Sequence, residues 1–414
     1  MNLLLYCNAF LPKVDGIVFR IKFFLDYIDI NYPKINVILV TPNPNTFKKY
    51  KRFKIIIIDG IKLSKLIKLN CADYVYVSNL SKLYKSKSII KNICITYNIN
   101  LIHIYHGDAL NLSIKIVAND LKIPVILSYH TNIIQYAKIF SSKLKYKILK
   151  FFHPIVFRFK KFDLILNVSK SNQDRLIKEK IFKKNYKFKL MPYVIDTNKF
   201  YPIKKNVKKN KLFTMLFVGR IEKEKNIDMI IEILKYLNNY ELIIVGDGNY
   251  KNELKNKCNN YNVKLVGKIK NDELYKYYNL ADVLINPSKT ESLGFTTLES
   301  MACKTVVVGF DSQGTSNLIK HMNTGCLFKT KDELIKYINL LKNNKNLKIK
   351  LENNAYKFVI KYDVKNYVDT MIKYYNKEIK IKKEFNKSNN SILDKLIEFI
   401  IYLFVKIILF LYQI

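Results

Sequence analysis

The sequence predicts an α/β protein built from two doubly wound parallel sheets, and two observations lead to this prediction. Short, continuous apolar runs recur along the chain with helix-like patterns between several of them, as expected of strands buried on both faces of a parallel sheet. The series then starts again after a break at 204–211 that is rich in lysine and asparagine. A chain of 414 residues is long enough for about two domains of ~150–200 residues each.

The first half opens with an apolar run at 2–7, which is followed by Pro12, Gly16 and an amphipathic stretch at 19–28. This order is typical of a strand, a loop and a helix. Further strands in the first half are expected at 37–40, 55–58, 101–104, 125–128 and 164–166. Strands in the second half are expected at 213–218, 241–245, 263–266, 283–285 and 305–308.

The patterns divide the chain into six segments. These are a first domain at 1–203, a linker at 204–211, a second domain at 212–362, a crossover helix at 363–379, a polar linker at 380–391 and an apolar segment at 392–414. The apolar segment is short for a spanning helix, which needs ~20 apolar residues. We therefore expect it to lie in a membrane interface as a shallow anchor, and a true span is the alternative. The N-terminal run has no basic stretch before it and no small-residue cleavage site, so it does not resemble a signal peptide.

Composition excludes several classes of protein. Hydrophobic residues make up 49% of the chain and charged residues 25%, which is a globular composition and excludes wholesale disorder. Six cysteines without C-x-x-C spacing exclude a zinc ribbon and a disulfide scaffold. Five histidines without an H-x-x-x-H pattern exclude a metalloprotease signature, and we expect no metal.

The formal net charge of +39 has two interpretations. A strongly basic protein can bind nucleic acid or an anionic membrane. Alternatively, the lysine excess reflects an AT-rich genome, because residues with AT-rich codons abound while only 11 glycines and 9 prolines occur. No helix-turn-helix, zinc-finger or RNP-type motif supports nucleic-acid binding, which stays a remote alternative.

The most informative stretch is 286–302, where a buried strand ends, a loop with Gly294 follows and a helix begins. Such a junction lies in the ligand crevice of an open α/β sheet, and a helix N-terminus there suits a phosphate group. Glu299 falls on the helix stripe that should face the core. A carboxylate in that position needs hydrogen-bond donors or a ligand hydroxyl, unless Glu291 and Glu299 are ordinary polar residues.

The pair Glu291-x7-Glu299 around Gly-Phe resembles the E-x7-E motif of retaining GT-B glycosyltransferases. Three further blocks occur in the family's order. Residues 217–226 resemble V-G-R-x-x-x-E-K-[GN], 245–248 resemble V-G-D-G, and 194–202 resemble G-V-D-x-x-x-F-x-P. The resemblance implies a GT-B fold, in which two Rossmann-like domains face a cleft, the first taking the acceptor and the second the nucleotide sugar; here a C-terminal apolar helix would follow.

The resemblance also implies roles for individual residues. Arg220 and Lys225 would neutralise the departing nucleotide diphosphate, since fixed cations can do this without a metal; alternatively they form a surface ion-pair cluster with nearby glutamates. Glu291 would bind donor-sugar hydroxyls, and Glu299 would hold the ribose. The implied catalytic residues are His130, Arg220, Lys225 and Glu291. The implied donor-binding residues are Gly16, Gly219, Arg220, Lys225, Gly246, Glu291, Ser292, Leu293, Gly294, Phe295 and Glu299.

Within this superfamily, Ser128-Tyr129-His130-Thr131 followed by Gln135-Tyr136 resembles the S-Y-H-T-H block of the sulfoquinovosyltransferases. The segment 14–16 with Arg20 resembles their V-S-G-Y-x-x-R entry. That resemblance implies transfer of sulfoquinovose from UDP-sulfoquinovose to diacylglycerol, with no cofactor, at a plastid or photosynthetic membrane. Related lipid mannosyltransferases and glucosyltransferases share much of the pattern and remain alternatives.

In the family, a histidine at the position of His130 reaches the donor sugar; a lone histidine is otherwise more often structural. His103 and His106 also lie at a strand end and are expected to be core or cleft histidines. The sequence departs from the family's pattern at Val194, Asn132, Lys304, Gln313 and Asn317. These departures bear on the identity of the donor more than on the fold.

The segment 138–161 interleaves lysine and arginine with aromatic and aliphatic residues. Such a helix suits an anionic bilayer surface, and it follows His130 closely; the alternative is an ordinary amphipathic helix. The residues expected at the acceptor or the membrane are Tyr129, Tyr136, Lys143, Lys147 and Lys150. The sequence therefore predicts a peripheral or monotopic membrane enzyme whose partners are a UDP-sugar, a lipid acceptor and a membrane surface.

Overall fold

The computed structural model divides the chain into two compact units. Unit 1 comprises Met1–Pro192 together with the residues from Val368 onward, and unit 2 comprises Tyr193–Tyr367. The structure describes residues 1–8, 10–11, 16–44, 50–58, 60–62, 76–78, 83–105, 110–130, 143, 147, 150, 154, 157, 161–203, 212–289 and 294–384. The boundary between the units lies at Pro192, whereas 203 was predicted, and the described residues 368–384 belong to unit 1.

The described strands of unit 1 form a seven-stranded parallel sheet in the order β3-β2-β1-β6-β7-β8-β9. They are β1 (Asn2–Cys7), β2 (Asn36–Thr41), β3 (Lys54–Ile57), β6 (Leu101–Tyr105), β7 (Val125–Tyr129), β8 (Leu164–Asn167) and β9 (Phe188–Leu190). A separate antiparallel pair consists of β4 (Gly60–Lys62) and β5 (Tyr76–Ser78). The central strands β6 and β7 are buried along their whole length, because helices cover both faces of the sheet.

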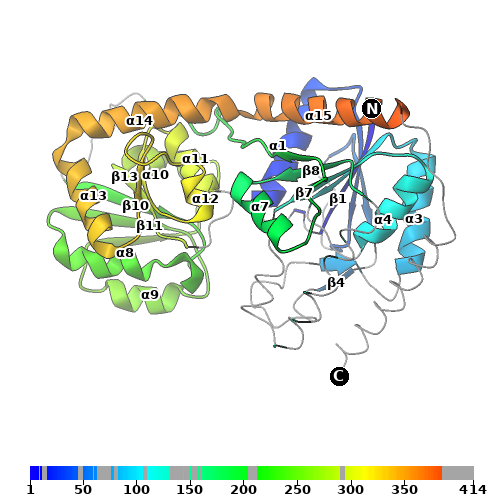
Figure 1. Ribbon diagram of the computed structural model, residues 1–414. Helices are drawn as coiled ribbons and strands as arrows, with labels where there is room; N and C mark the ends of the chain where they lie inside the picture. The colour runs from blue at the N-terminus through cyan, green and yellow to red at the C-terminus, as the bar shows by residue number, and fades with distance from the viewer. Residues whose placement is uncertain are drawn as a thin grey trace. The chain divides into compact units, whose positions relative to one another are not determined.

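The helices of unit 1 are α1 (Gly16–Asn31), α3 (Leu83–Thr96), α4 (Leu110–Asp120), α7 (Lys170–Lys178) and most of α15 (Val364–Glu384). Helices α3 and α4 lie together on one face of the sheet, whereas α15 lies beside α1 on the other (Figure 1). The Phe24 ring on α1 meets the Tyr375 ring of α15 edge-on at 5.8 Å. Ion pairs Lys187–Glu378 and Lys382–Asp163 further attach α15 to this unit.

The described strands of unit 2 form a six-stranded parallel sheet in the order β12-β11-β10-β13-β14-β15. They are β10 (Phe213–Val218), β11 (Tyr240–Val245), β12 (Val263–Gly267), β13 (Val283–Asn286), β14 (Val306–Phe310) and β15 (Cys326–Phe328). The α-helices are α8 (Asp228–Ile233), α9 (Lys251–Cys258), α10 (Leu274–Leu280), α11 (Phe295–Ala302), α12 (Gln313–Ser316), α13 (Lys331–Asn343) and α14 (Lys345–Val359). Short 3-10 turns are η3 (Lys223–Lys225), η4 (Leu234–Tyr236) and η5 (Ile360–Tyr362).

The two parallel α/β sheets confirm the predicted fold class, and every strand predicted from an apolar run is present. The patterns did not reveal β9, β15 or the β4–β5 pair, because each of these strands has only three residues. The predicted crossover helix is α15, which continues to Glu384 into the segment expected to be a polar linker.

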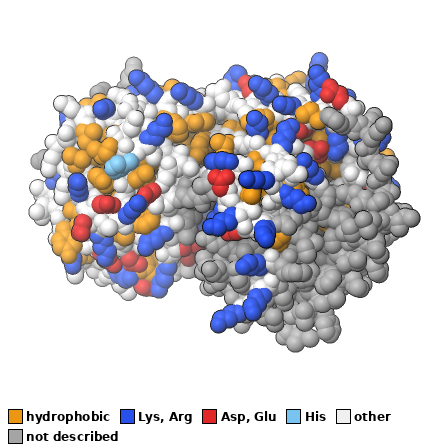
Figure 2. Space-filling model, viewed as in Figure 1, with side chains coloured by type: hydrophobic (Ala, Val, Ile, Leu, Met, Phe, Trp, Pro, Cys, Tyr) orange, Lys and Arg blue, Asp and Glu red, His pale blue; other side chains and the backbone are white. Residues whose placement is uncertain are grey.

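In the part of the chain that the structure describes, no helix combines the length and apolar character needed to cross a membrane. The apolar segment at 392–414 lies outside the described residues, as does the linker at 204–211. Figure 2 shows Lys and Arg side chains scattered over the visible face, not gathered into one stripe.

Candidate active site

Two neighbouring turns of unit 2 pack directly on each other where β10 and β11 end. Strand β10 leads into the turn at 219–221, and β11 leads into the turn at 246–248. The Ile221 N–H donates to the Asp247 carbonyl at 2.9 Å, and the Tyr250 N–H donates to the Ile221 carbonyl at 3.1 Å. Ligands of open α/β sheets bind at these carboxyl strand ends, so the paired turns form one wall of a candidate ligand site.

The close approach of the turns explains the glycines of the V-G-D-G block. A Cβ atom on Gly246 would lie 1.8 Å from the Gly219 carbonyl oxygen, and one on Gly248 would lie 2.3 Å from the Ile221 carbonyl oxygen. Gly246 also has a φ of +149°, which side-chain-bearing residues rarely adopt. These glycines are therefore required for the two backbones to meet, whatever they contact in a ligand.

Arg220 and Lys225 lie on the loop that follows β10. The Arg220 guanidinium is about half exposed, at 55%, and pairs with the Glu224 carboxylate at 2.6 Å. The surface ion pair considered from the sequence is therefore present for Arg220. Because an exposed pair of this kind contributes little to stability, the guanidinium can exchange Glu224 for an incoming diphosphate at small cost. Lys225 is the last residue of η3 and is partly buried.

Asn226 links this loop to the segment with the E-x7-E motif. It ends η3 in the left-handed conformation, with a φ of 55°, which asparagine and glycine tolerate best. Its side-chain amide donates to the Pro287 carbonyl at 3.3 Å. The structure thus brings the Arg220–Lys225 loop against the end of β13. We did not assign Asn226 a role from the sequence, although the [GN] position of the motif was a signal that could have found it.

The loop before α11 is only partly described, because Glu291, Ser292 and Leu293 lie outside the described residues. Gly294 precedes α11 with a φ of 60°, and a Cβ atom there would lie 2.5 Å from Leu318 Cδ1. Glycine suits this conformation, and a larger residue would require the Leu318 side chain to move. Phe295 begins the helix and is partly buried.

Polar side chains gather below the start of α11. The Asn286 side chain donates weakly to Thr297 Oγ1 at 3.5 Å and accepts from the Ser288 N–H at 3.3 Å. Ser288 Oγ is fully buried and has no hydrogen-bond partner among the described residues. Buried polar atoms are normally satisfied, so this hydroxyl is a candidate ligand contact that the sequence reasoning missed.

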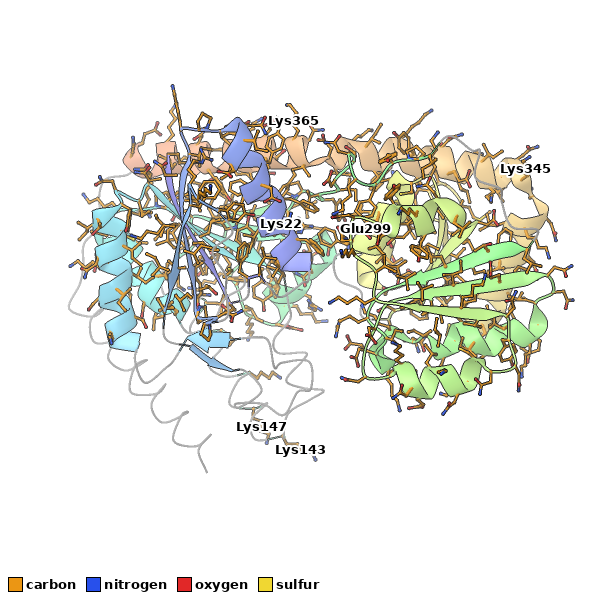
Figure 3. All side chains as sticks on the ribbon, turned by 180° about the vertical axis from the view of Figure 1, so that it is seen from behind. Lys22, Lys143, Lys147, Glu299, Lys345 and Lys365 are labelled. Carbon is orange, nitrogen blue, oxygen red and sulfur yellow. The ribbon has the colours of Figure 1, made fainter. Side chains whose placement is uncertain are left out.

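Glu299 is the buried carboxylate that the helix pattern predicted, and it projects from α11 (Figure 3). The Tyr278 hydroxyl of α10 donates to Glu299 Oε2 at 2.6 Å, and no described residue donates to Oε1. Burial raises the pKa of Glu299 to about 7, while the hydrogen bond from Tyr278 and the charge of Lys199 act in the opposite direction. One oxygen is therefore satisfied by the protein and the other is suited to a ligand hydroxyl.

Lys199, whose charge favours the ionised form of Glu299, also pairs with Asp272. It borders an open hollow of about 390 Å³. The lining residues are Asp196, Asn198, Lys199, Tyr201, Asp272 and Tyr275. Lys199 therefore both lines this surface hollow of unit 2 and acts electrostatically on Glu299.

In unit 1, His130 directly follows β7 and is 6% exposed. Its ring lies parallel to the Tyr105 ring, with 6.3 Å between centroids. Tyr129 points to the other side of the sheet, where it is 3% exposed and meets Phe157 and Phe182 edge-on at 5.7 Å. Tyr129 is therefore a core residue, which corrects the expectation that it lies at the acceptor or membrane. Neighbouring residues of a strand face opposite sides, and this separates it from His130.

Gly16 is the first residue of α1, not a loop residue as the sequence suggested. Arg20, four residues further along α1, is 1% exposed and donates through Nη1 to the Pro192 carbonyl at 2.6 Å. Arg20, the arginine of the entry block, therefore binds the backbone of Pro192, after which the chain enters unit 2. Strand pairing places α1 and His130 at the same sheet edge, since both follow carboxyl ends of parallel strands.

Lys143, Lys147 and Lys150 are helical and exposed. Their spacing of four and three residues puts them on one helix face, and Figure 3 shows Lys143 and Lys147 close together. Tyr136 lies outside the described residues. Among the departures from the family's pattern, Lys304 has a φ of 57°, which explains why glycine is usual at this position.

Several known proteins are similar to this chain in fold and in sequence. A sucrose-phosphate synthase from Thermosynechococcus elongatus superposes with a TM-score of 0.69, at 16% identity, over 91% of this chain and 98% of that chain. Anabaena Alr3699/HepE, solved in complex with UDP-glucose, superposes with a TM-score of 0.66, at 16% identity, over 91% of this chain and 100% of that chain. Residues 200–358 match the family described as Glycosyl transferases group 1. The chain therefore has the fold of these solved structures, and residues 200–358 match a glycosyltransferase domain.

Two curated glycosyltransferases are similar in sequence. The alpha-monoglucosyldiacylglycerol synthase of Streptococcus pneumoniae is 26% identical over 360 residues, which cover 81% of this chain and 76% of that protein. The sulfoquinovosyl transferase SQD2 of Arabidopsis thaliana is 26% identical over 231 residues, which cover 52% of this chain and 44% of that protein. Among the unit 2 site residues described above, Asp196, Asn198 and Lys199 precede the matched domain at 200–358, and the others lie within it.

Proposed function

We propose that this glycosyltransferase moves a hexose from a nucleoside diphosphate donor to a diacylglycerol-type membrane lipid, with retention of the anomeric configuration. The observation that carries the donor part is the hydrogen bond from Asn226 to Pro287. It joins a loop with two cations to the segment that leads to a buried carboxylate with one oxygen available. A nucleotide sugar requires cations that bind its diphosphate and a carboxylate that binds its ribose hydroxyls.

The same residues suit the chemistry. As the bond between the sugar C1 and the diphosphate breaks, negative charge develops on the leaving group, and Arg220 and Lys225 offset it. The acceptor hydroxyl attacks C1 from the same side and its proton passes to the departing phosphate oxygen, so no protein nucleophile is needed. Glu299 holds the ribose and fixes the donor. In this proposal the two cations do the work of a metal, and transfer persists in excess EDTA.

The lipid acceptor is supported by the first relative named above, which by its name is a synthase of monoglucosyldiacylglycerol. The exposed face of Lys143, Lys147 and Lys150 adds a physical reason, since clustered lysines attract anionic lipid headgroups. Transfer of glucose is favoured by the first relative, which aligns with 81% of this chain. Transfer of sulfoquinovose is the second candidate, favoured by the Ser128–Thr131 block and by the shorter similarity to SQD2.

A donor screen tests the proposal. Purified protein is mixed with vesicles of diacylglycerol and phosphatidylglycerol and offered UDP-glucose, UDP-sulfoquinovose, UDP-galactose or GDP-mannose, with glycolipid read by mass spectrometry. Lys225→Ala should abolish product, while Lys345→Ala, which removes an exposed lysine at the start of α14 (Figure 3), should not. Product from one donor identifies the sugar. No product from any donor overturns the proposal.

Vesicle sedimentation tests the membrane part separately. Replacing Lys143, Lys147 and Lys150 together with glutamine should weaken binding to phosphatidylglycerol vesicles by about tenfold or more. The matched control replaces three exposed lysines from other helices: Lys255, Lys345 and Lys373. Equal losses in both triple variants would mean that net charge, and not this helix face, attracts the membrane.

A further inference from the structure

Three aromatic rings follow one another along one face of the unit 1 sheet: His103, Tyr105 and His130. His103 and Tyr105 are alternate residues of β6, so both side chains point to the same face. Tyr105 pairs with Ser128 in the β6–β7 register, and His130 lies two residues beyond Ser128. The topology therefore brings a histidine from the end of β7 beside a tyrosine from the end of β6.

The ring geometry is that of a stack with Tyr105 in the middle. The His103 and Tyr105 centroids are 4.0 Å apart with 36° between the ring planes. The Tyr105 and His130 rings are nearly parallel, at 10°, with centroids 6.3 Å apart. His103 and Tyr105 are fully buried, and His130 is 6% exposed. The nearly parallel packing of Tyr105 and His130 is a preferred arrangement of aromatic rings, whereas the His103 and Tyr105 rings are tilted against each other.

The inner end of the stack is fixed. His103 Nδ1 lies 2.7 Å from the Tyr375 hydroxyl of α15, and Nε2 lies 2.7 Å from Ser128 Oγ. Burial lowers the pKa of His103 to about 3, so the imidazole stays neutral, with one ring nitrogen donating and the other accepting. A ring held at both nitrogens cannot rotate without losing a buried hydrogen bond. This satisfied core histidine is one of the two outcomes expected from the sequence.

We propose that Tyr105 is a positioning residue: its ring, backed by His103, presents a flat surface that holds the His130 imidazole in one orientation during glycosyl transfer. The terminal torsion of histidine is broad, so an imidazole beside the reacting sugar needs a neighbour that restricts it. A reactive group has to be held within about 10–20° of its productive orientation. The inference rests on the proposed function, because it takes His130 as the histidine that reaches the donor sugar.

Two readouts separate positioning from simple packing. The first is the donor kinetics of Tyr105→Phe, which keeps the ring, and of Tyr105→Met, which keeps much of the volume without a flat face. Tyr105→Phe should stay within about twofold of the wild-type kcat. Tyr105→Met should lose kcat by about tenfold while the donor KM changes less than twofold. In a His130→Ala background, Tyr105→Met should cause no further loss, because the residues act as a unit.

The second readout needs no activity. In protein labelled with ¹³C-histidine, the His130 ring-proton signal is assigned by its absence from His130→Ala. Tyr105→Met should lower the ¹³C relaxation order parameter of the His130 ring, whereas Tyr105→Phe should leave it close to the wild-type value. If the wild type transfers no sugar, the proposed function fails, while the NMR result still decides whether Tyr105 orients His130. An unchanged order parameter in Tyr105→Met, or equal losses of kcat with and without His130, would overturn the inference.

Discussion

The Tyr278 hydroxyl donates a 2.6 Å hydrogen bond to Oε2 of Glu299, and both side chains are buried between α10 and α11. A carboxylate on a core-facing helix stripe is costly without donors, and the sequence left open whether a donor or a ligand would satisfy it. The structure gives one oxygen to Tyr278 and leaves the other without a described donor. The site therefore carries an energetic cost in the free protein, which a bound ribose would reduce.

Glu299 should make the stability of the free protein depend on pH. Its pKa in the folded state is about 7, above the ordinary 4.5, so its stabilising contribution is present at low pH and is lost as pH rises through about 7. The difference corresponds to about 3 kcal/mol. Urea unfolding between pH 5 and pH 8 should show this decline in the wild type and a clearly smaller decline in Glu299→Gln. Parallel pH profiles in the two proteins would contradict the assignment.

Tyr278→Phe should weaken nucleotide binding in a pH-dependent way. The substitution removes a hydrogen bond that favours the ionised form of Glu299, so the pKa of Glu299 rises further. Calorimetry should find UDP binding several-fold weaker than wild type at pH 7 and close to wild type at pH 9. A loss of the same size at both pH values would point to disturbed packing against Phe200, whose ring meets Tyr278 at 6.0 Å.

Gly246→Ala should destabilise unit 2 far more than Gly267→Ala. Both glycines have positive φ, but a Cβ on Gly246 would lie 1.8 Å from the Gly219 carbonyl oxygen, whereas one on Gly267 meets nothing within 4 Å. Backbone strain alone costs about 1–2 kcal/mol, and the clash should bring the cost at Gly246 above about 4 kcal/mol. Urea midpoints measure both. Similar losses for the two variants would mean that the turns do not pack as described.

Asn226→Gly should separate the backbone of the η3 loop from its side-chain contact. Glycine keeps the left-handed conformation at φ 55° but loses the hydrogen bond to Pro287. We expect stability within about 0.5 kcal/mol of the wild type and a several-fold increase in donor KM. Asn226→Ala should in addition lose about 1 kcal/mol of stability. A wild-type donor KM in Asn226→Gly would show that the contact does not order the site.

The limits of sequence reasoning are clearest at single residues. The burial of Glu299 followed from helix periodicity, and the strands followed from apolar runs, because both depend on local spacing. Tyr129 and His130 are adjacent in sequence and stand in one motif, yet the structure puts Tyr129 in the core against Phe157 and Phe182. The roles of Asn226 and Ser288 were not predicted either, because their partners or surroundings come from other strands.

By itself, the sequence determined two α/β domains, the positions of most strands along the chain and the family's motif blocks. These features depend on local periodicity and on short segments. Only the tertiary structure decided that Tyr278 satisfies Glu299, that Asn226 joins two motif segments and that Tyr105 lies between two histidines. The physical reason is that Tyr278–Glu299, Asn226–Pro287 and Tyr105–His130 each join residues from different elements of the fold. Which of them meet depends on the register of parallel strands and the packing of helices on them, and no local pattern encodes that.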